Sequence, residues 1–185
     1  MQEFAIAALS IVLHVVNYNA TAQVEHATRV FTKILGKNAV YYYAVYLVVS
    51  ALVRDHFIQQ AVILDQGSFS IASKPIMQAA GWTLGAVGII MNLWTLKALG
   101  IKGMYNGDSF GFLMDAPVTD GPYKYMQEPQ YNGTTIVLIG TAIYYQSFTG
   151  LVLAGIMYAV FMISVVFVER PHMLKLYSKN TNKNK

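Results

Sequence analysis

The chain has 185 residues, with 13 Lys and Arg, 9 Asp and Glu, and a formal net charge of +4. Hydrophobic residues make up 55% of it and charged residues 12%, whereas roughly 25% of the residues of a typical soluble domain are charged. This composition excludes disordered, collagen-like and disulfide-stabilised chains and argues against a soluble enzyme. Because the positive charge is small and scattered, we expect no nucleic-acid partner. The sequence therefore predicts an integral membrane protein.

Cysteine is absent from the sequence, which excludes disulfides, a thiolate nucleophile and a Cys-based metal site. The four histidines, His14, His26, His56 and His172, are far apart in the sequence. None has another histidine four residues away on the same helix face, so we expect no metal site.

The first predicted membrane segment covers about residues 4–19. It is strongly apolar only from Phe4 to Val16, which is short for a membrane span of about 20 residues. A re-entrant or interfacial segment is one interpretation, and a signal peptide cleaved near Ala20 is another. Glu3 stands where a signal peptide has basic residues, which argues against cleavage.

Four further segments lie between charged residues, at about 38–53, 81–97, 135–145 and 150–168. The last two share one uncharged stretch that is too long for a single span, and Tyr144 to Gly150 divides it. The segment at 135–145 either packs against the last span or forms a hairpin with it. The basic tail, residues 171–185, is expected in the cytosol by the positive-inside rule. We therefore predict an all-α polytopic membrane bundle of three to four spans with a short N-terminal membrane segment, forming one domain over residues 1–185.

A long connection rich in Gly, Pro and Tyr runs from Ile101 to Gln130. A polar loop of this length in so small a membrane protein is more often functional than structural. It contains Asp108, Asp115 and, near its end, Glu128.

Several motifs resemble those of the phospholipid N-methyltransferases, which methylate phosphatidylethanolamine toward phosphatidylcholine. The main one runs from Leu99 to Met114 and includes Gly107-Asp108-Ser109-Phe110-Gly111. Further matches, in the same order and spacing, are Val118-Thr119, Pro122, Pro129, Tyr131, Gly133 and Tyr177, with Glu25-His26 and Arg54-Asp55-His56-Phe57 earlier in the chain. The resemblance covers nearly the whole chain.

The resemblance implies S-adenosylmethionine as cofactor and a phospholipid in the bilayer as substrate. The family's Gly-x-Gly triplet falls on Ala86, Val87 and Gly88, and its paired Glu-Glu falls on Glu169 and Arg170. These five residues are the expected cofactor contacts, although Ala86 and Arg170 depart from the pattern, as does Glu128 where the family has Asn. From the residues alone, glycines in a span also suit helix packing, and Glu169-Arg170 also suits a solvated helix end.

We expect a nearby carboxylate to take the proton of the attacking amine, and the candidates are Glu128, Asp108 and Asp115. The resemblance also implies the endoplasmic reticulum membrane, with a mitochondrial membrane as the alternative. Gly121-Pro122-Tyr123-Lys124-Tyr125 is similar to the isoprenylcysteine carboxyl methyltransferases as well, and a catalytically inactive relative is the non-enzyme alternative. The sequence specifies neither the methylation step nor the oligomeric state, and is compatible with an oligomer.

Overall fold

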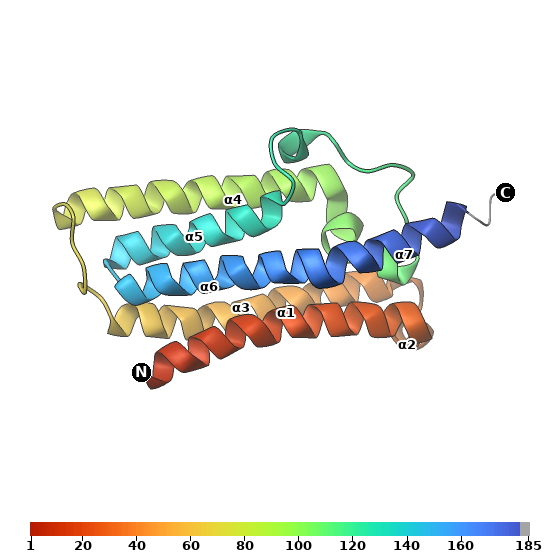
Figure 1. The fold of residues 1–185 in the computed structure, drawn as a ribbon, viewed down its shortest axis with the longest axis horizontal. Helices are drawn as coiled ribbons and strands as arrows, with labels where there is room; N and C mark the ends of the chain where they lie inside the picture. The colour runs from red at the N-terminus through yellow and green to blue at the C-terminus, as the bar shows by residue number, and fades with distance from the viewer. Residues whose placement is uncertain (182–185) are drawn as a thin grey trace.

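The computed structural model describes residues 1–181, which form a bundle of long helices with no β-strand among them (Figure 1). Four stretches are long and apolar enough to cross a membrane. They are Gln2–Thr28, Val30–Leu64, Lys74–Phe110 and Phe148–Ser178. The predicted all-α membrane bundle is confirmed.

Helix α1 (Gln2–Thr28) is longer than the predicted N-terminal segment. Ala7, Ile11 and Val15 lie one turn apart and are buried in the core, as the helical period requires. The polar residues that follow do not end the helix because they find partners inside the bundle: the Asn19 side-chain amide donates to the Ser164 hydroxyl at 2.7 Å. Helix α1 thus supplies side chains to the core of the bundle.

Helix α3 (Ala39–Leu64) follows the short elements α2 (Val30–Leu35) and η1 (Gly36–Asn38). It extends well beyond the predicted boundary at residue 53. The charge of Arg54 does not stop it, because Arg54 pairs with the neighbouring Asp55 at 2.7 Å within the bundle.

Helices α4 (Lys74–Met104) and α5 (Pro129–Tyr145) pack closely and run antiparallel (Figure 1). Glycines set their separation: a Cβ added at Gly88 would lie 2.5 Å from the carbonyl oxygen of Gly133, and one added at Gly81 would lie 2.6 Å from that of Gly140. Backbones approach this closely only where no side chain intervenes.

The segment that we predicted at 135–145 belongs to α5, and it forms the hairpin alternative with α6 (Phe148–Ser164). The hairpin closes at Gln146, which has φ 54°, and at Ser147, the N-cap of α6. Asp65, just after α3, accepts a hydrogen bond from the backbone N–H of Thr149 at 2.7 Å and so supports the turn. Because α5 runs back along the bundle, the loop before it and the end of α6 lie at the same end of the molecule (Figure 1).

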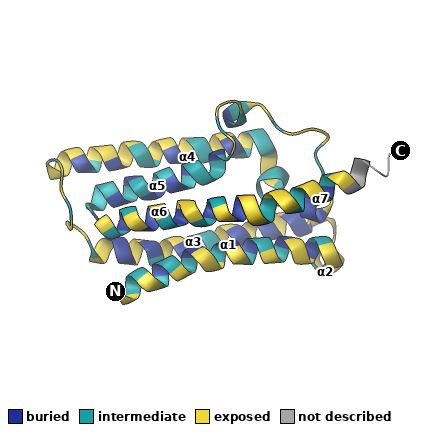
Figure 2. Ribbon diagram, viewed as in Figure 1, coloured by how far each residue is buried: buried dark blue, intermediate teal, exposed yellow. Residues whose placement is uncertain are grey.

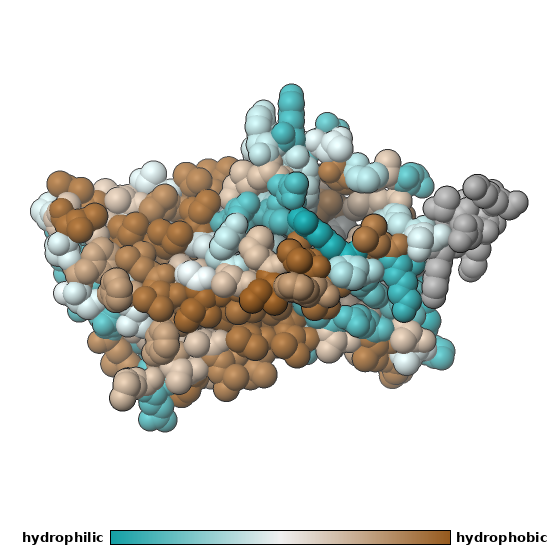
Figure 3. Space-filling view, in the orientation of Figure 1, coloured by the Kyte–Doolittle hydropathy of each residue, from teal (hydrophilic) through white to brown (hydrophobic). Residues whose placement is uncertain are grey.

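The outward faces of the helices are exposed and apolar (Figure 2). Examples from three helices are Leu52, Ile90 and Phe167. A broad hydrophobic area covers much of the visible side of the bundle, and hydrophilic residues gather towards the end that carries the loop (Figure 3). An apolar surface on this scale suits contact with lipid rather than water.

At the loop end, α6 continues through the π-helical turn η4 (Val165–Glu169) into α7 (Arg170–Thr181). Helix α7 projects beyond the other helices (Figure 1). The final part of the predicted basic tail, residues 182–185, lies outside the described residues.

Candidate active site

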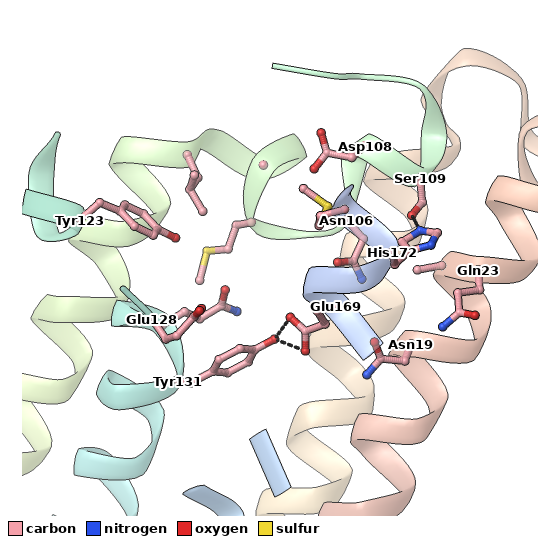
Figure 4. Close-up of a pocket in the computed structure, with 16 residues that line it drawn as sticks. Asn19, Gln23, Asn106, Asp108, Ser109, Tyr123, Glu128, Tyr131, Glu169 and His172 are labelled. Carbon is pink, nitrogen blue, oxygen red and sulfur yellow. Dashed lines mark hydrogen bonds between the residues drawn. The ribbon is translucent and has the colours of Figure 1, made fainter. Parts of the chain in front are cut away.

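A cavity of about 160 Å³ opens at the loop end of the bundle, and we call it the end cavity. Helices α1, α4 and α5, the turns η2 (Gly107–Phe110) and η3 (Gly121–Lys124), and the start of α7 all contribute to its wall. Polar side chains that line it include Asn19, Asn106, Asp108, Glu128, Tyr131 and Glu169 (Figure 4).

A larger depression of about 770 Å³ adjoins the end cavity, and we call it the loop groove. The two share Gly103, Asp108, Glu128 and Glu169 as walls. The loop groove adds apolar side chains from residues 114–118 and from α7. Its volume lies within the range of about 300–1,000 Å³ that is typical of small-molecule sites.

Glu169 is the centre of the polar network at the end cavity. Its Oε1 atom accepts hydrogen bonds from the hydroxyls of Tyr18 at 2.7 Å, Tyr131 at 2.8 Å and Ser164 at 2.6 Å. The Tyr131 hydroxyl also lies 2.7 Å from Oε2, as the dashed lines in Figure 4 show. Three hydroxyl donors hold this carboxylate in one orientation on the cavity wall.

The local backbone explains why Ser164 and Glu169 meet. They are five residues apart, and the η4 turn between them is π-helical. A π-turn pairs residue i with residue i+5, which brings the Ser164 hydroxyl onto the Glu169 carboxylate. The last apolar helix thus turns its first charged residue inward rather than toward solvent.

Asp108 lies on the side of the cavity away from Tyr131 (Figure 4). The Tyr177 hydroxyl of α7 donates to Asp108 Oδ1 at 2.7 Å and accepts a hydrogen bond from the backbone N–H of Met114 at 3.0 Å. This chain of contacts fastens α7 and the loop to η2. The motif residues Asp108 and Tyr177, which are far apart in the sequence, therefore stabilise one wall together.

Glu128 and Arg170 form an ion pair, with Oε1 and Nη2 3.1 Å apart. Both residues line the loop groove. Partial burial raises the pKa of the Glu128 carboxyl above its ordinary value, the Arg170 guanidinium opposes that shift, and Glu169 adds to it. Burial, and then the charge of Glu128, raises the pKa of the Tyr123 hydroxyl to about 12, so that this hydroxyl stays protonated at neutral pH.

The structure brings together four of the predicted site residues, Asp108, Glu128, Glu169 and Arg170. Asp115 also lines the loop groove, but on its exposed outer part.

Ala86, Val87 and Gly88 lie elsewhere, part-way along α4. The first two are exposed on the outer face, and Gly88 is buried against Gly133 of α5. The observed contact of Gly88 is helix packing, and the expected cofactor contact of this triplet stays a prediction.

Tyr18, Asn19 and Ser164 belong to the site but were not identified from the sequence. A signal existed for each: Tyr18 and Asn19 interrupt an apolar stretch, and Ser164 is a hydroxyl inside a strongly apolar span. The sequence alone does not show that Tyr18 contacts Glu169, because the two residues are 151 positions apart.

The segment from Glu25 to Arg29 has a structural role. Glu25 is fully buried and accepts hydrogen bonds from the backbone N–H of Phe31, at 2.8 Å, and from the Thr32 hydroxyl. Arg29 has φ 59° and donates to the carbonyl oxygen of Ser109 at 3.3 Å. These contacts fix the turn between α1 and α2 against η2, beside the cavity.

Comparison with known proteins identifies the family. A family model described as phospholipid methyltransferase matches residues 76–180. The chain is 54% identical over 179 residues to phosphatidylethanolamine N-methyltransferase B of Dictyostelium discoideum, covering 97% of this chain and 90% of that one. It is 33% identical to a phosphatidyl-N-methylethanolamine N-methyltransferase of Emericella nidulans, with 95% and 86% covered, and 29% identical to human phosphatidylethanolamine N-methyltransferase, with 97% and 90% covered. No solved structure matches the chain. The predicted resemblance is confirmed, and the chain belongs to the phospholipid methyltransferase family.

Proposed function

We propose that this chain transfers methyl groups to the head-group amine of phosphatidylethanolamine, of its mono- and dimethyl derivatives, or of both, and so contributes to phosphatidylcholine synthesis. Family membership and the names of its relatives support this activity. The observation that carries it in the structure is the inward-facing Glu169 carboxylate, held by three hydroxyls on a cavity where a bundle of membrane helices meets its polar end.

The proposed methyl donor is S-adenosylmethionine, and the residues present fit it. The Glu169 carboxylate would bind the amino group of the cofactor, and the Arg170 guanidinium would bind the cofactor's carboxylate. The apolar walls of the loop groove would contact the rest of the cofactor. When bound, this cofactor supplies an electrophilic methyl group on a sulfonium centre. Tyr123 and Tyr131 line the end cavity and present aromatic rings, which attract a cationic group.

A primary or secondary amine attacks only when it is neutral, so a nearby group has to accept its proton. Asp108 and Glu128 are the better placed of the predicted candidates, because both line the end cavity as well as the loop groove. The raised pKa of Glu128 brings its proton affinity closer to that of the amine. The chain's remaining task is positioning, which contributes roughly 7–11 kcal/mol in well-oriented reactions.

The proposed location is the endoplasmic reticulum membrane, with a mitochondrial membrane as the alternative, and the active end faces the cytosol. Within the described residues, basic side chains gather at the loop end, whereas Lys74 begins α4 at the opposite end. Those at the loop end include Arg29, Lys33, Lys37, Lys102, Lys124 and Arg170. By the positive-inside rule, this distribution supports a cytosolic position for the loop end and the cavity, where a soluble cofactor is available.

The test is to incubate the purified protein in lipid vesicles with labelled S-adenosylmethionine. Separate vesicles contain phosphatidylethanolamine, its monomethyl form or its dimethyl form, and a prenylcysteine substrate serves as comparison. Label in a phospholipid supports the proposal, and the preferred lipid identifies the step. Label only in the prenylcysteine would support the carboxyl methyltransferase alternative, which the comparisons do not favour.

Glu169→Gln tests the site itself. We expect the variant to insert into membranes and fold normally but to lose cofactor binding. Tyr158→Phe on the exposed side of α6 is the matched control. Cofactor affinity that is unchanged in Glu169→Gln would contradict the assignment.

A further inference from the structure

A second cavity, of about 420 Å³, lies deeper in the bundle between α3 and α4, and we call it the lateral groove. Its polar lining includes His14, Arg54, Asp55, Asn92, Asn106 and Tyr131. Asn106 and Tyr131 also line the end cavity, so the two cavities meet at these side chains. Apolar residues of α3 and α4, among them Leu52 and Ile89, form the outer walls.

The lateral groove holds an ion pair at membrane depth. Arg54 lies roughly 22 Å from the start of α3 and roughly 15 Å from its end, at 1.5 Å per residue. Its Nε and Nη2 atoms donate to Asp55 Oδ1 at 2.9 Å and 2.7 Å. The Arg54 side chain is 6% exposed, whereas that of Asp55 is 53% exposed. Ionisable residues inside a membrane are costly and mark functional positions by default.

The guanidinium of this pair has capacity for a ligand. Both hydrogen bonds to Asp55 come from Nε and Nη2 of Arg54, and no hydrogen bond among the described residues uses Nη1. Asn92 also lines the groove, but its Oδ1 packs against Gly133 of α5 and its Nδ2 donates to Thr134 at 3.3 Å. Arg54 Nη1 is therefore the donor that a ligand in the groove can use.

The chemistry of this guanidinium matches the phosphate of a phospholipid head group, because a guanidinium N–H binds a phosphate oxygen. The order along the groove also fits. Arg54 and His14 both line it, and His14 lies one turn of α1 further from Glu169 than Tyr18, whose hydroxyl donates to that carboxylate. Tyr131 lies at the junction with the end cavity.

We propose that the lateral groove binds the head group of a phospholipid inside the bundle, with Arg54 Nη1 holding the phosphate. The amine then points toward Tyr131 and the end cavity, and the acyl chains leave between α3 and α4 into the bilayer. This inference rests on the proposed function, since it places the amine next to the site of methyl transfer.

The first test measures lipid binding to the purified full-length protein in detergent. The probes are dioleoylphosphatidylethanolamine, dioleoylphosphatidylcholine and dioleoylglycerol, which lacks a head group. We expect the wild type to bind the phosphatidylethanolamine at least fivefold more tightly than the dioleoylglycerol. Equal affinity for these two lipids would overturn the proposal without need of any variant.

A double variant tests the named atom. Arg54→Gln with Asp55→Asn removes both charges together, so that neither is left unpaired. It should raise the KM for phosphatidylethanolamine about tenfold and leave cofactor affinity unchanged. Gln60→Leu, on the exposed side of α3, is the control. Unchanged KM and lipid affinity in the double variant would overturn the inference.

The outcomes separate this inference from the proposed function. Head-group binding that depends on Arg54, in a protein that methylates no lipid, would support the groove and contradict the activity. Lipid methylation that is unchanged by the substitution of Arg54 would support the activity and contradict the groove.

Discussion

The hydroxyl of Tyr131 reaches both carboxylate oxygens of Glu169, at 2.8 Å and 2.7 Å. Its ring is stacked on Phe161, with 4.5 Å between the ring centroids. One side chain from the start of α5 therefore orients the charged residue that follows α6 and also forms the junction between the end cavity and the lateral groove.

Tyr131→Phe isolates the hydroxyl, because phenylalanine keeps the ring stacked on Phe161. A hydrogen bond to a charged group contributes about 1.5–3 kcal/mol, and each 1.4 kcal/mol corresponds to about tenfold in affinity. We therefore expect cofactor affinity to fall about tenfold or more, as measured by titration calorimetry. Tyr158→Phe controls for the loss of an exposed tyrosine hydroxyl. Equal affinities in the two variants would contradict the positioning role of Tyr131.

The pair formed by Glu128 and Arg170 gives one reason for two departures from the family pattern. The resemblance leads us to expect Asn and a second Glu where this sequence has Glu128 and Arg170, and the structure places the two 3.1 Å apart. The negative charge that one replacement adds is therefore paired with the positive charge that the other adds.

A double-mutant cycle tests this compensation. Arg170→Glu alone puts a third carboxylate beside Glu128 and Glu169 and should lower kcat/KM. Adding Glu128→Asn removes the repulsion and should restore part of the loss. We expect a coupling of about 1 kcal/mol, or roughly fivefold in rate, because partly exposed pairs seldom exceed this. Additive effects of the two substitutions would show that the pair is not coupled.

The helical architecture and the motifs that resemble the family could be identified from the sequence, but the lengths of the helices could not. Arg54 looked like the end of a span, although its charge is matched by Asp55 inside the bundle. Asn19 looked like the end of a short segment, although Ser164 accepts its hydrogen bond. In each case the partner comes from the three-dimensional arrangement, which a window of hydropathy does not contain.

The residues of the candidate site could also be predicted only in part. Asp108, Glu128 and Glu169 were predicted, because carboxylates at the edge of membrane segments stand out in an apolar sequence. Tyr18 and Ser164 were not, because a tyrosine and a serine within helices are ordinary core or interfacial residues until Glu169 is seen beside them. The sequence also left the direction of α5 open. Because α5 runs back along the bundle, the loop before it and Glu169 after α6 lie at the same end of the molecule (Figure 1).

The pH dependence of the reaction tests Glu128 as the proton acceptor. Glu128 accepts a proton only when it is ionised, so the rate should fall as the pH decreases through its raised pKa. Arg170 favours the ionised form. Arg170→Gln should therefore raise the pKa of Glu128 further and move the acid limb of the kcat/KM profile to higher pH. The profile of Glu128→Gln should lack this limb. An acid limb that stays in place in Arg170→Gln would contradict the assignment and favour Asp108.

Two neighbouring glycines of α4 offer a matched comparison of helix packing. A Cβ added at Gly88 would lie 2.5 Å from the Gly133 carbonyl oxygen, whereas one added at Gly85 meets nothing within 4 Å. Overpacking costs about 1–3 kcal/mol, and each kcal/mol lowers the melting temperature by about 2–4 °C in a chain of this size. We expect Gly88→Ala to melt several degrees below the wild type in detergent and Gly85→Ala to melt close to it.

The same pair of variants separates packing from cofactor contact. Cofactor affinity is measured well below both melting temperatures, where each variant is folded. If Gly88 acts only through its contact with Gly133, folded Gly88→Ala should bind the cofactor within about twofold of Gly85→Ala, since the substitution then changes stability and not the site. A loss of tenfold or more in Gly88→Ala alone would instead support the cofactor contact expected for Ala86, Val87 and Gly88. Equal melting temperatures would show that α4 and α5 adjust to the added methyl group, and that their glycine contact is less tight than the structure indicates.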